Sequence, residues 1–171
     1  MQKRQETPKQ SQTSKADLLF IRADKLEESG DLRGAFRLFL AGAKAGDTGC
    51  QLNLGNYYDD GKGIRRNRAK ALYWYKKAYR RGGASAAYNI AILWRNEHEP
   101  TRALPWFKRA VKMGDAEANL EIAKYLLAAE DGLPKAIAHL ERVCRSKSVA
   151  EAGAEEAARL LKQARKKLNL S

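Results

Sequence analysis

The chain has 171 residues, of which 44% are apolar and 31% are charged, a composition typical of one soluble domain with a core of its own. No apolar run approaches the ~20 residues that a membrane span requires, and the first 15 residues lack the apolar segment of a secretory signal. Unless a leader has already been removed, we expect a cytoplasmic location, in a bacterium. The net charge is +13, and residues 61–83 contribute +9 of it, so the basicity is local to one stretch.

The chain begins with a polar segment, residues 1–13, that we expect to be a disordered tail because it offers little apolar surface to bury. Ser14, followed three residues later by Asp17, is typical of a helix start, because such side chains accept hydrogen bonds from free amides of the first turn. The folded part of the chain is therefore predicted to begin at residue 14. The spacings described next indicate a single repeat domain over residues 14–171.

Beyond this start, the sequence contains four similar segments. Their opening alanines are 36, 32 and 33 residues apart, and each precedes an aromatic residue or leucine by four positions: Ala35 with Phe39, Ala71 with Tyr75, Ala103 with Phe107 and Ala136 with Leu140. Another set of small residues precedes a large one by three positions: Ala23 with Leu26, Gly55 with Tyr58, Ala91 with Trp94 and Ala123 with Leu126. These spacings place each pair on one helix face, so four two-helix units are predicted, over about 16–47, 48–83, 84–115 and 116–147.

Glycines and aspartates mark the predicted helix ends. Gly46, Gly82 and Gly114 occupy one shared position in the first three units, where a glycine can end the second helix in the left-handed conformation. Asp47 and Asp115 follow directly and are predicted to cap the next helix.

The second unit has the most specific pattern. Its inter-helix loop, DDGKGIRRNR, is longer than those of the other units, and the run LGNYYDDGKGIRRNRAKALYWYKKAYRRGG resembles a Sel-one-like repeat. The matching positions are Gly61, Gly63, Ile64, Lys70, Ala71, Trp74, Tyr75, Lys77, Ala78 and Gly82, while Asn67 stands where that family has a helix-capping aspartate. The other three units look more like ordinary tetratricopeptide repeats. The resemblance implies an all-α fold, a right-handed α/α solenoid of about four two-helix repeats.

The last segment is predicted to be a capping helix over 148–168. Ser148 and Glu151 form a predicted capping box at its start. One face of this helix carries leucines and alanine at helical spacing, and the other carries cations. Such a helix would close the apolar end of the array and present its charges to water.

Residues for catalysis or metal binding do not occur in a recognisable arrangement. His98, in the predicted loop NEHEP, and His139, on a predicted helix, have no recognisable partner that would make either a base or a metal ligand. Cys50 and Cys144 fit neither a disulfide framework nor a zinc site, and both are expected to be small buried side chains. We therefore expect no enzyme activity, no cofactor and no metal.

A partner is expected on the surface of the array, because the first helices of stacked units usually line a concave groove. The predicted contacts lie one and four residues after the small residue of each first helix, and three before it: Asn56, Asp59, Tyr88, Ile92, Arg95 and Lys124. For Tyr88 the alternative is packing between units, and for the polar residues it is a solvated face.

The basic stretch is predicted to lie on the opposite, convex side. At about 100° per residue, Ala71, Tyr75 and Ala78 share the inward face, which leaves Tyr73 and part of Trp74 as exposed rings. The candidate anion-binding residues are Arg65, Arg66, Arg68, Lys70, Lys76, Lys77, Arg80 and Arg81.

Two functions follow from these surfaces. The favoured one is a non-enzymatic, monomeric scaffold or adaptor that binds a protein or peptide on the concave face; an immunity or antagonist role is one form of it that no residue selects. The alternative is polyanion binding, to nucleic acid, an acidic protein or an anionic membrane, through the basic convex residues 62–81.

Overall fold

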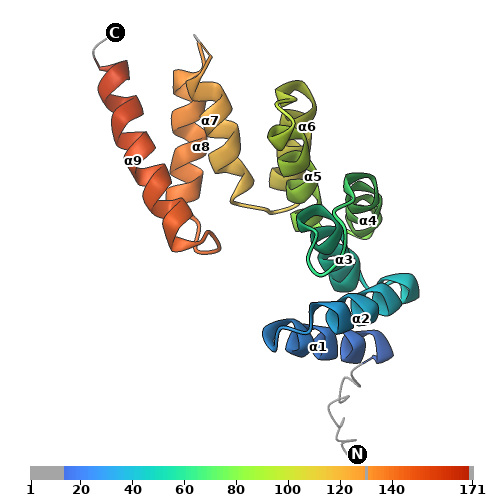
Figure 1. Ribbon diagram of the computed structural model, residues 1–171. Coiled ribbons are helices and arrows are strands. Elements are labelled where there is room, and N and C mark those ends of the chain that lie inside the picture. Colours follow the sequence, from blue (N-terminus) through green and yellow to red (C-terminus); the bar gives the residue numbers. More distant parts are fainter. Residues whose placement is uncertain (1–13, 130, 170–171) are drawn as a thin grey trace, which may run out of the picture.

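The computed structural model describes residues 14–129 and 131–169, and within these ranges the chain forms nine α-helices and no β-strand. The helices are α1 (Lys15–Glu28), α2 (Leu32–Ala45), α3 (Thr48–Asp60), α4 (Arg68–Arg80), α5 (Ala84–Asn96), α6 (Pro100–Lys112), α7 (Ala118–Leu127), α8 (Leu133–Arg145) and α9 (Glu151–Leu168). Consecutive helices pack as pairs along a curved array that ends in α9 (Figure 1). The predicted all-α solenoid is confirmed. The predicted tail, 1–13, lies outside the described residues.

The residues that define the repeat form the core of the array. Its alanines have no exposed surface, namely Ala23, Ala35, Ala71, Ala91, Ala103, Ala123 and Ala136. The large side chains of the second helices are at most 2% exposed: Phe39, Tyr75, Phe107 and Leu140. Burying a side chain of this size contributes roughly 1.5–3 kcal/mol, so the same positions that recur in the sequence stabilise each helix pair.

The second unit departs from this pattern by having a glycine where the others have alanine. A Cβ added to Gly55 would lie 2.3 Å from Tyr75 Cε1, far inside van der Waals contact. The missing side chain lets the Tyr75 ring lie against the backbone of α3. Its hydroxyl then reaches Asn56 on the next residue of α3, at 2.8 Å. The glycine thus positions a polar contact at the surface.

Most helix starts agree with the sequence prediction. Ser14 and Asp17 form a reciprocal capping box, Asp47 Oδ1 accepts from Cys50 N at 2.6 Å, and Asn67 Oδ1 accepts from Lys70 N at 2.9 Å. Asp115 also accepts a backbone hydrogen bond, from Ala118 N at 3.1 Å. That amide is the first of α7, whose N-cap position is Glu117, so the prediction that Asp115 is the N-cap is wrong and Asp115 stabilises the turn before the helix.

The predicted capping box at the start of α9 is wrong. The hydroxyl of Ser148 lies 3.0 Å from that of Ser146, and Ala150 takes the N-cap position. The Ala150 N–H donates to Glu117 Oε1 at 3.4 Å. A carboxylate from the start of the preceding unit therefore accepts this bond, a tertiary contact that a local pattern does not contain.

The predicted glycine helix ends are confirmed. Gly46, Gly82 and Gly114 have φ values of +96°, +89° and +94°, the left-handed region that other residues adopt at a cost. Gly63, inside the long loop, has a φ of +63° and lies against the start of α2, where an added Cβ would be 2.9 Å from Leu32 Cβ. The loop of the second unit is thus fixed on the first unit.

The two cysteines have different environments. Cys50 is fully buried as predicted, and burial together with the Asp47 carboxylate raises the pKa of its thiol to about 12. The prediction for Cys144 is wrong, because this side chain is exposed. Its neighbour Val143 faces the core together with Ala136 and Leu140 of α8, which turns Cys144 toward the surface beside Leu161 and Arg165 of α9.

Candidate functional site

The first helices of consecutive units contact one another through polar side chains. We call the surface formed by α3, α5, α7 and α9 the first-helix face. An amide pair links α3 to α5, an ion pair links α5 to α7, and another links α7 to α9. All the predicted partner-binding residues lie on α3, α5 or α7.

A small pocket lies on this face around Asn56. Its volume is about 170 Å³, and it is lined by Asn56, Asp59, Asp60, Tyr75, Asn89 and Ile92. Asn56 Oδ1 accepts two hydrogen bonds, from Tyr75 Oη at 2.8 Å and from Asn89 Nδ2 at 2.9 Å. Burial, and then the negative charges of Asp59 and Asp60, raise the pKa of Tyr75, so its hydroxyl keeps its proton and donates it.

Charged residues continue the face beyond the pocket. Glu121 on α7 has a side chain that is only 8% exposed, and it accepts from Arg95 at 2.7 Å and from Lys124 at 3.2 Å. Lys124 also pairs with Glu156 of α9 at 2.9 Å. Burial opposes the charge of Lys124, but the bonds to Glu156 and Glu121 outweigh it and raise its pKa. A ladder of ion pairs thus connects the first helices α5 and α7 to the capping helix α9.

The structure divides the predicted partner-binding residues into three groups. Asn56, Asp59 and Ile92 line the pocket, whereas Arg95 and Lys124 belong to the ladder. Tyr88 is half-buried and meets the Phe107 ring edge-on, with the centroids 5.7 Å apart. Burial, followed by the charge of Glu121, raises the pKa of Tyr88 to about 12.

Sequence reasoning missed two residues of this face, Asn89 and Glu121. Each stands two positions before the small residue of its first helix, Ala91 or Ala123, and the equivalent position of the second unit is Asn53. An amide within the apolar run AAYNIAIL is the signal that could have identified Asn89. A polar residue at one repeated register indicates contact between neighbouring first helices.

The predicted anion-binding residues do not form one surface. Arg68 is half-buried: it pairs with Glu97, donates to the carbonyl of Leu93 and lies 5.4 Å from the Trp94 ring. Lys77 lies over the rings of Tyr73 and Trp74, at 4.9 and 5.0 Å. These two cations are held in contacts within the protein.

Three other cations lie on the outward side of α4 and its end. Lys76, Arg80 and Arg81 are exposed, and none has an ion pair within the described ranges. The guanidinium of Arg81 lies against Gly46, where an added Cβ would be 2.9 Å from its Nη2. Of the nearby rings, Tyr73 is 52% exposed as expected, whereas Trp74 is only 8% exposed and more deeply buried than the sequence suggested.

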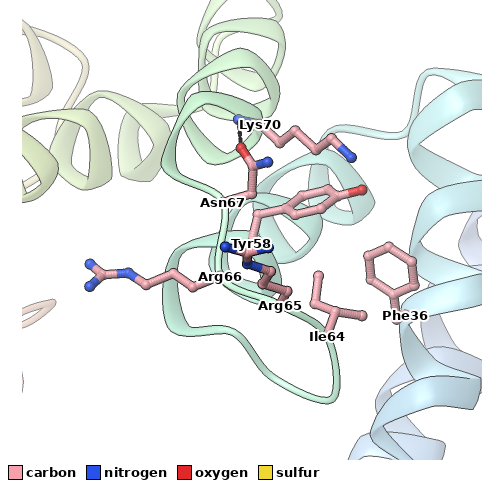
Figure 2. Close-up of a pocket in the computed structure, with 7 residues that line it drawn as sticks. All are labelled: Phe36, Tyr58, Ile64, Arg65, Arg66, Asn67 and Lys70. Atoms are coloured by element: carbon pink, nitrogen blue, oxygen red, sulfur yellow. Dashed lines mark hydrogen bonds between the residues drawn. The ribbon is translucent and has the colours of Figure 1, made fainter.

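The remaining cations line a second pocket, of about 490 Å³, between α2, the end of α3, the long loop and the start of α4. We call it the loop pocket; its lining is Phe36, Tyr58, Ile64, Arg65, Arg66, Asn67 and Lys70. Figure 2 shows the Lys70 side chain running along the Tyr58 ring, with the Arg66 guanidinium pointing away from Phe36 and Ile64. Arg66 instead lies 3.4 Å from Asp59, at the edge of the first-helix face.

The histidines occupy unlike environments. His98 is exposed in a loop with a φ of +58°. His139 is half-buried, and its Nδ1–H donates to Asn119 Oδ1 at 2.9 Å; the Asn119 amide nitrogen donates in turn to the Ala116 carbonyl. No group of three potential metal-ligating side chains occurs in the described part of the chain. None of the helices placed there is long and apolar enough to cross a bilayer.

His139 is expected to make stability depend on pH. Burial, and then the positive charges of Arg142 and Lys108, lower its pKa, so the unfolded chain binds this proton more tightly than the folded chain. Stability is therefore at its full value above the ordinary histidine pKa of about 6.5, and it falls as the pH drops from there toward the folded-state pKa.

Urea unfolding at pH 7.5, 6.5 and 5.5 checks this prediction. The free energy of unfolding of His139→Gln should fall less over this range than that of the wild type. His98→Gln, which removes the exposed histidine, is the control and should match the wild type. An equal fall in all three proteins would show that His139 is not responsible.

Comparison with known proteins identifies the repeat. Residues 49–83 and 84–115 match the model of the Sel1 repeat family, so the match includes the third unit as well as the second. A search of curated proteins finds no match. A Sel1 repeat protein from Oxalobacter formigenes shares the fold, with a TM-score of 0.68, 22% identity, and 85% of this chain and 60% of that chain covered.

Two further solved structures are similar. One is c5321, a protective antigen with an SLR fold from uropathogenic Escherichia coli strains, with a TM-score of 0.66, 23% identity, and coverage of 74% of this chain and 29% of that one. The other is YrrB, a TPR protein with an unusual peptide-binding site, with a TM-score of 0.58, 20% identity, and coverage of 88% and 78%. This chain matches 60% of the length of the Oxalobacter protein and 29% of the length of c5321, and at these identities the likeness is one of fold.

Proposed function

We propose, from a chain that contains two Sel1 repeats in an all-helical solenoid, that this protein is a non-enzymatic interaction scaffold that binds a peptide segment of a partner protein on its first-helix face. Repeats of the Sel1 and tetratricopeptide type are generally protein-interaction scaffolds. YrrB has a peptide-binding site on a related fold, which supports the same class of ligand for this chain.

The observation that carries the proposal is the amide pair of Asn56 and Asn89. Asn56 Oδ1 is occupied by two donors, but Asn56 Nδ2 and Asn89 Oδ1 have no hydrogen-bond partner among the described residues. One is a donor and the other an acceptor, which are the groups that a peptide bond needs as partners. Both residues line the pocket of about 170 Å³, where they can offer these groups to a peptide bond.

Charges beside the amide pair indicate which side chains the bound segment carries. Asp59 and Asp60 border the pocket and favour a cationic side chain or free backbone amides nearby. On α5 and α7, Arg95 and Lys124 are already paired with Glu121, so this part of the face offers balanced charge. We expect the peptide to carry lysine or arginine near the Asn56 pocket.

Selection from a displayed library of random peptides on the full chain tests the function. The enriched peptides are measured by calorimetry against the wild type, Asn56→Ala/Asn89→Ala and, as a control, Gln163→Ala on the exposed side of α9. Loss of two hydrogen bonds at about 1 kcal/mol each predicts binding weaker by roughly 30-fold in the double variant. The control should bind like the wild type.

Two outcomes would contradict the proposal. Peptides that bind the double variant as well as the wild type would occupy another surface. A selection that enriches no peptide would exclude a peptide-binding groove. Circular dichroism of the double variant checks that it folds, because Asn56→Ala also removes the acceptor of the Tyr75 hydroxyl.

A further inference from the structure

The loop pocket combines apolar walls with two cations, Arg65 and Lys70, whose charge no acidic side chain neutralises among the described residues. Phe36, Tyr58 and Ile64 supply the apolar surface, and Arg65 and Lys70 make no ion pair in the part of the chain that the structure describes. Lys70 Nζ lies 5.2 Å from the centre of the Tyr58 ring. In the view of Figure 2, Tyr58 lies between Lys70 and Arg65, and the apolar side chains of Phe36 and Ile64 lie beside its ring.

The loop that forms the pocket is fixed at several points. Gly63 lies against Leu32, and Lys62 pairs with Glu27 of α1 at 2.9 Å. At its other end the Asn67 N–H donates to the Tyr58 carbonyl at 2.7 Å. The walls are thus contributed by two repeat units and held together before any ligand binds, which lowers the cost of ordering a site on binding.

The charge around the pocket is unfavourable for the helix that it borders. The first turn of α4 contains Arg68 and Lys70 and no acid, although the positive end of the helix dipole lies there. Cations at this position do not stabilise a helix. An anion in the pocket would be attracted by Arg65, by Lys70 and by the helix N-terminus together, which gives these residues a role in binding.

The shape of the pocket distinguishes between anionic ligands. The rings of Phe36 and Tyr58 meet at 88° with centroids 5.5 Å apart, and Lys70 covers the Tyr58 ring. Two rings at a right angle form a corner rather than the stacking platform on which single-stranded nucleic acids bind. A corner accepts a branched aliphatic side chain well.

We propose that the loop pocket binds an acidic peptide segment of a partner protein, with one carboxylate at Arg65 and another at Lys70, on the two sides of Tyr58, and an aliphatic side chain against Phe36, Tyr58 and Ile64. This site is distinct from the first-helix face and does not depend on peptide binding there. Its specificity comes from requiring charge and apolar contact in one short segment, as exposed charge alone contributes little in water.

Calorimetry with three capped hexapeptides tests the proposal on the full chain. One alternates glutamate with leucine, one alternates glutamate with glycine, and one alternates glutamine with leucine. The glutamate–leucine peptide should bind saturably below about 1 mM and more tightly than the other two. The double variant Arg65→Gln/Lys70→Gln should weaken its binding at least about tenfold, the equivalent of about 1.4 kcal/mol.

The matched control is Lys76→Gln/Arg80→Gln, which removes the same charge from the outward side of α4. It should weaken binding less than about twofold, through long-range electrostatics alone. Ile64→Ser should weaken binding of the glutamate–leucine peptide and leave binding of the glutamate–glycine peptide unchanged. The Asn56→Ala/Asn89→Ala variant should bind the glutamate–leucine peptide normally, which separates this site from the first-helix face.

Several results would overturn the proposal. Equal losses in the two charge variants would mean that general basicity attracts the peptide. Equal binding of the glutamate–glycine peptide would remove the apolar contact from the site. A single-stranded oligonucleotide that binds more tightly through Arg65 and Lys70 would make this a nucleic-acid site, and absence of saturable binding would leave no peptide site.

Discussion

Replacing Gly55 with alanine is expected to lower the free energy of unfolding by about 2 kcal/mol, because the added Cβ enters a packed helix contact. It would lie 2.3 Å from Tyr75 Cε1 and 2.4 Å from Cδ1, and the ring cannot retreat without losing its hydrogen bond to Asn56. In an ordinary helix interior the same change would stabilise by up to about 1 kcal/mol. Urea unfolding measures the effect, and a loss of stability rather than a gain shows that the Tyr75 ring lies too close to Gly55 for a Cβ.

A double-mutant cycle with Tyr75→Leu tests the cause. The fourth unit has alanine and leucine at the equivalent positions, Ala123 and Leu140, both buried. In the Tyr75→Leu background, Gly55→Ala should cost much less, with a coupling energy of about 1–2 kcal/mol. Gly153→Ala on α9 is the control, because its added Cβ meets no ring and contacts only side-chain methyl groups, of Val149 at 3.0 Å and of Leu120 at 3.9 Å. If the effects of Gly55→Ala and Tyr75→Leu on the free energy of unfolding were additive, the contact with the Tyr75 ring would not be the cause of the destabilisation.

Replacing Gly63 with alanine is expected to destabilise the protein by about 2–3 kcal/mol. The left-handed backbone costs roughly 1–2 kcal/mol for a residue with a Cβ. In addition, the new Cβ would lie 2.9 Å from Leu32 Cβ and 3.3 Å from the Leu32 carbonyl carbon, which must move apart. The loop would then lose its close contact with α2, and the loop pocket would lose its fixed geometry.

Gly82→Ala is the matched control for this change. Gly82 has a φ of +89°, and an added Cβ would meet nothing within 4 Å, so only the backbone cost applies. Urea unfolding should show a larger loss for Gly63→Ala than for Gly82→Ala by about 1 kcal/mol. Equal losses would mean that the contact with Leu32 gives way without cost.

The fold could be predicted because small and large residues recur at fixed spacing in each repeat unit. Ala35 and Phe39 define one helix contact, and the same pair type recurs at Ala103 and Phe107 with burial in each case. Packing of this kind depends on periodicity, which a sequence contains directly. The start of α9 was predicted wrongly because its bond partner, Glu117, belongs to another unit.

The candidate sites could be predicted only in part. Asn56 was predicted from its register, but whether an arginine is free depends on where the loop directs it. Arg65 and Arg68 are three residues apart in one basic run, yet Arg68 is held by Glu97 and Arg65 lines a pocket. From the sequence alone, the two arginines are equally good candidates for binding an anion. Only the path of the loop separates a structural cation from one that can bind a ligand.

The contacts of Arg68 have a consequence for how the two surfaces act together. Its guanidinium joins the start of α4 to the last turn of α5 through Glu97 and the Leu93 carbonyl, which limits bending between the second and third units. The loop pocket includes Asn67 and Lys70, on either side of Arg68, and the Asn56 pocket includes Asn89 and Ile92 of α5, so this junction helps to hold the two pockets at one separation. A partner that contacts both must present two segments at that spacing, so distance along its chain becomes part of what is recognised.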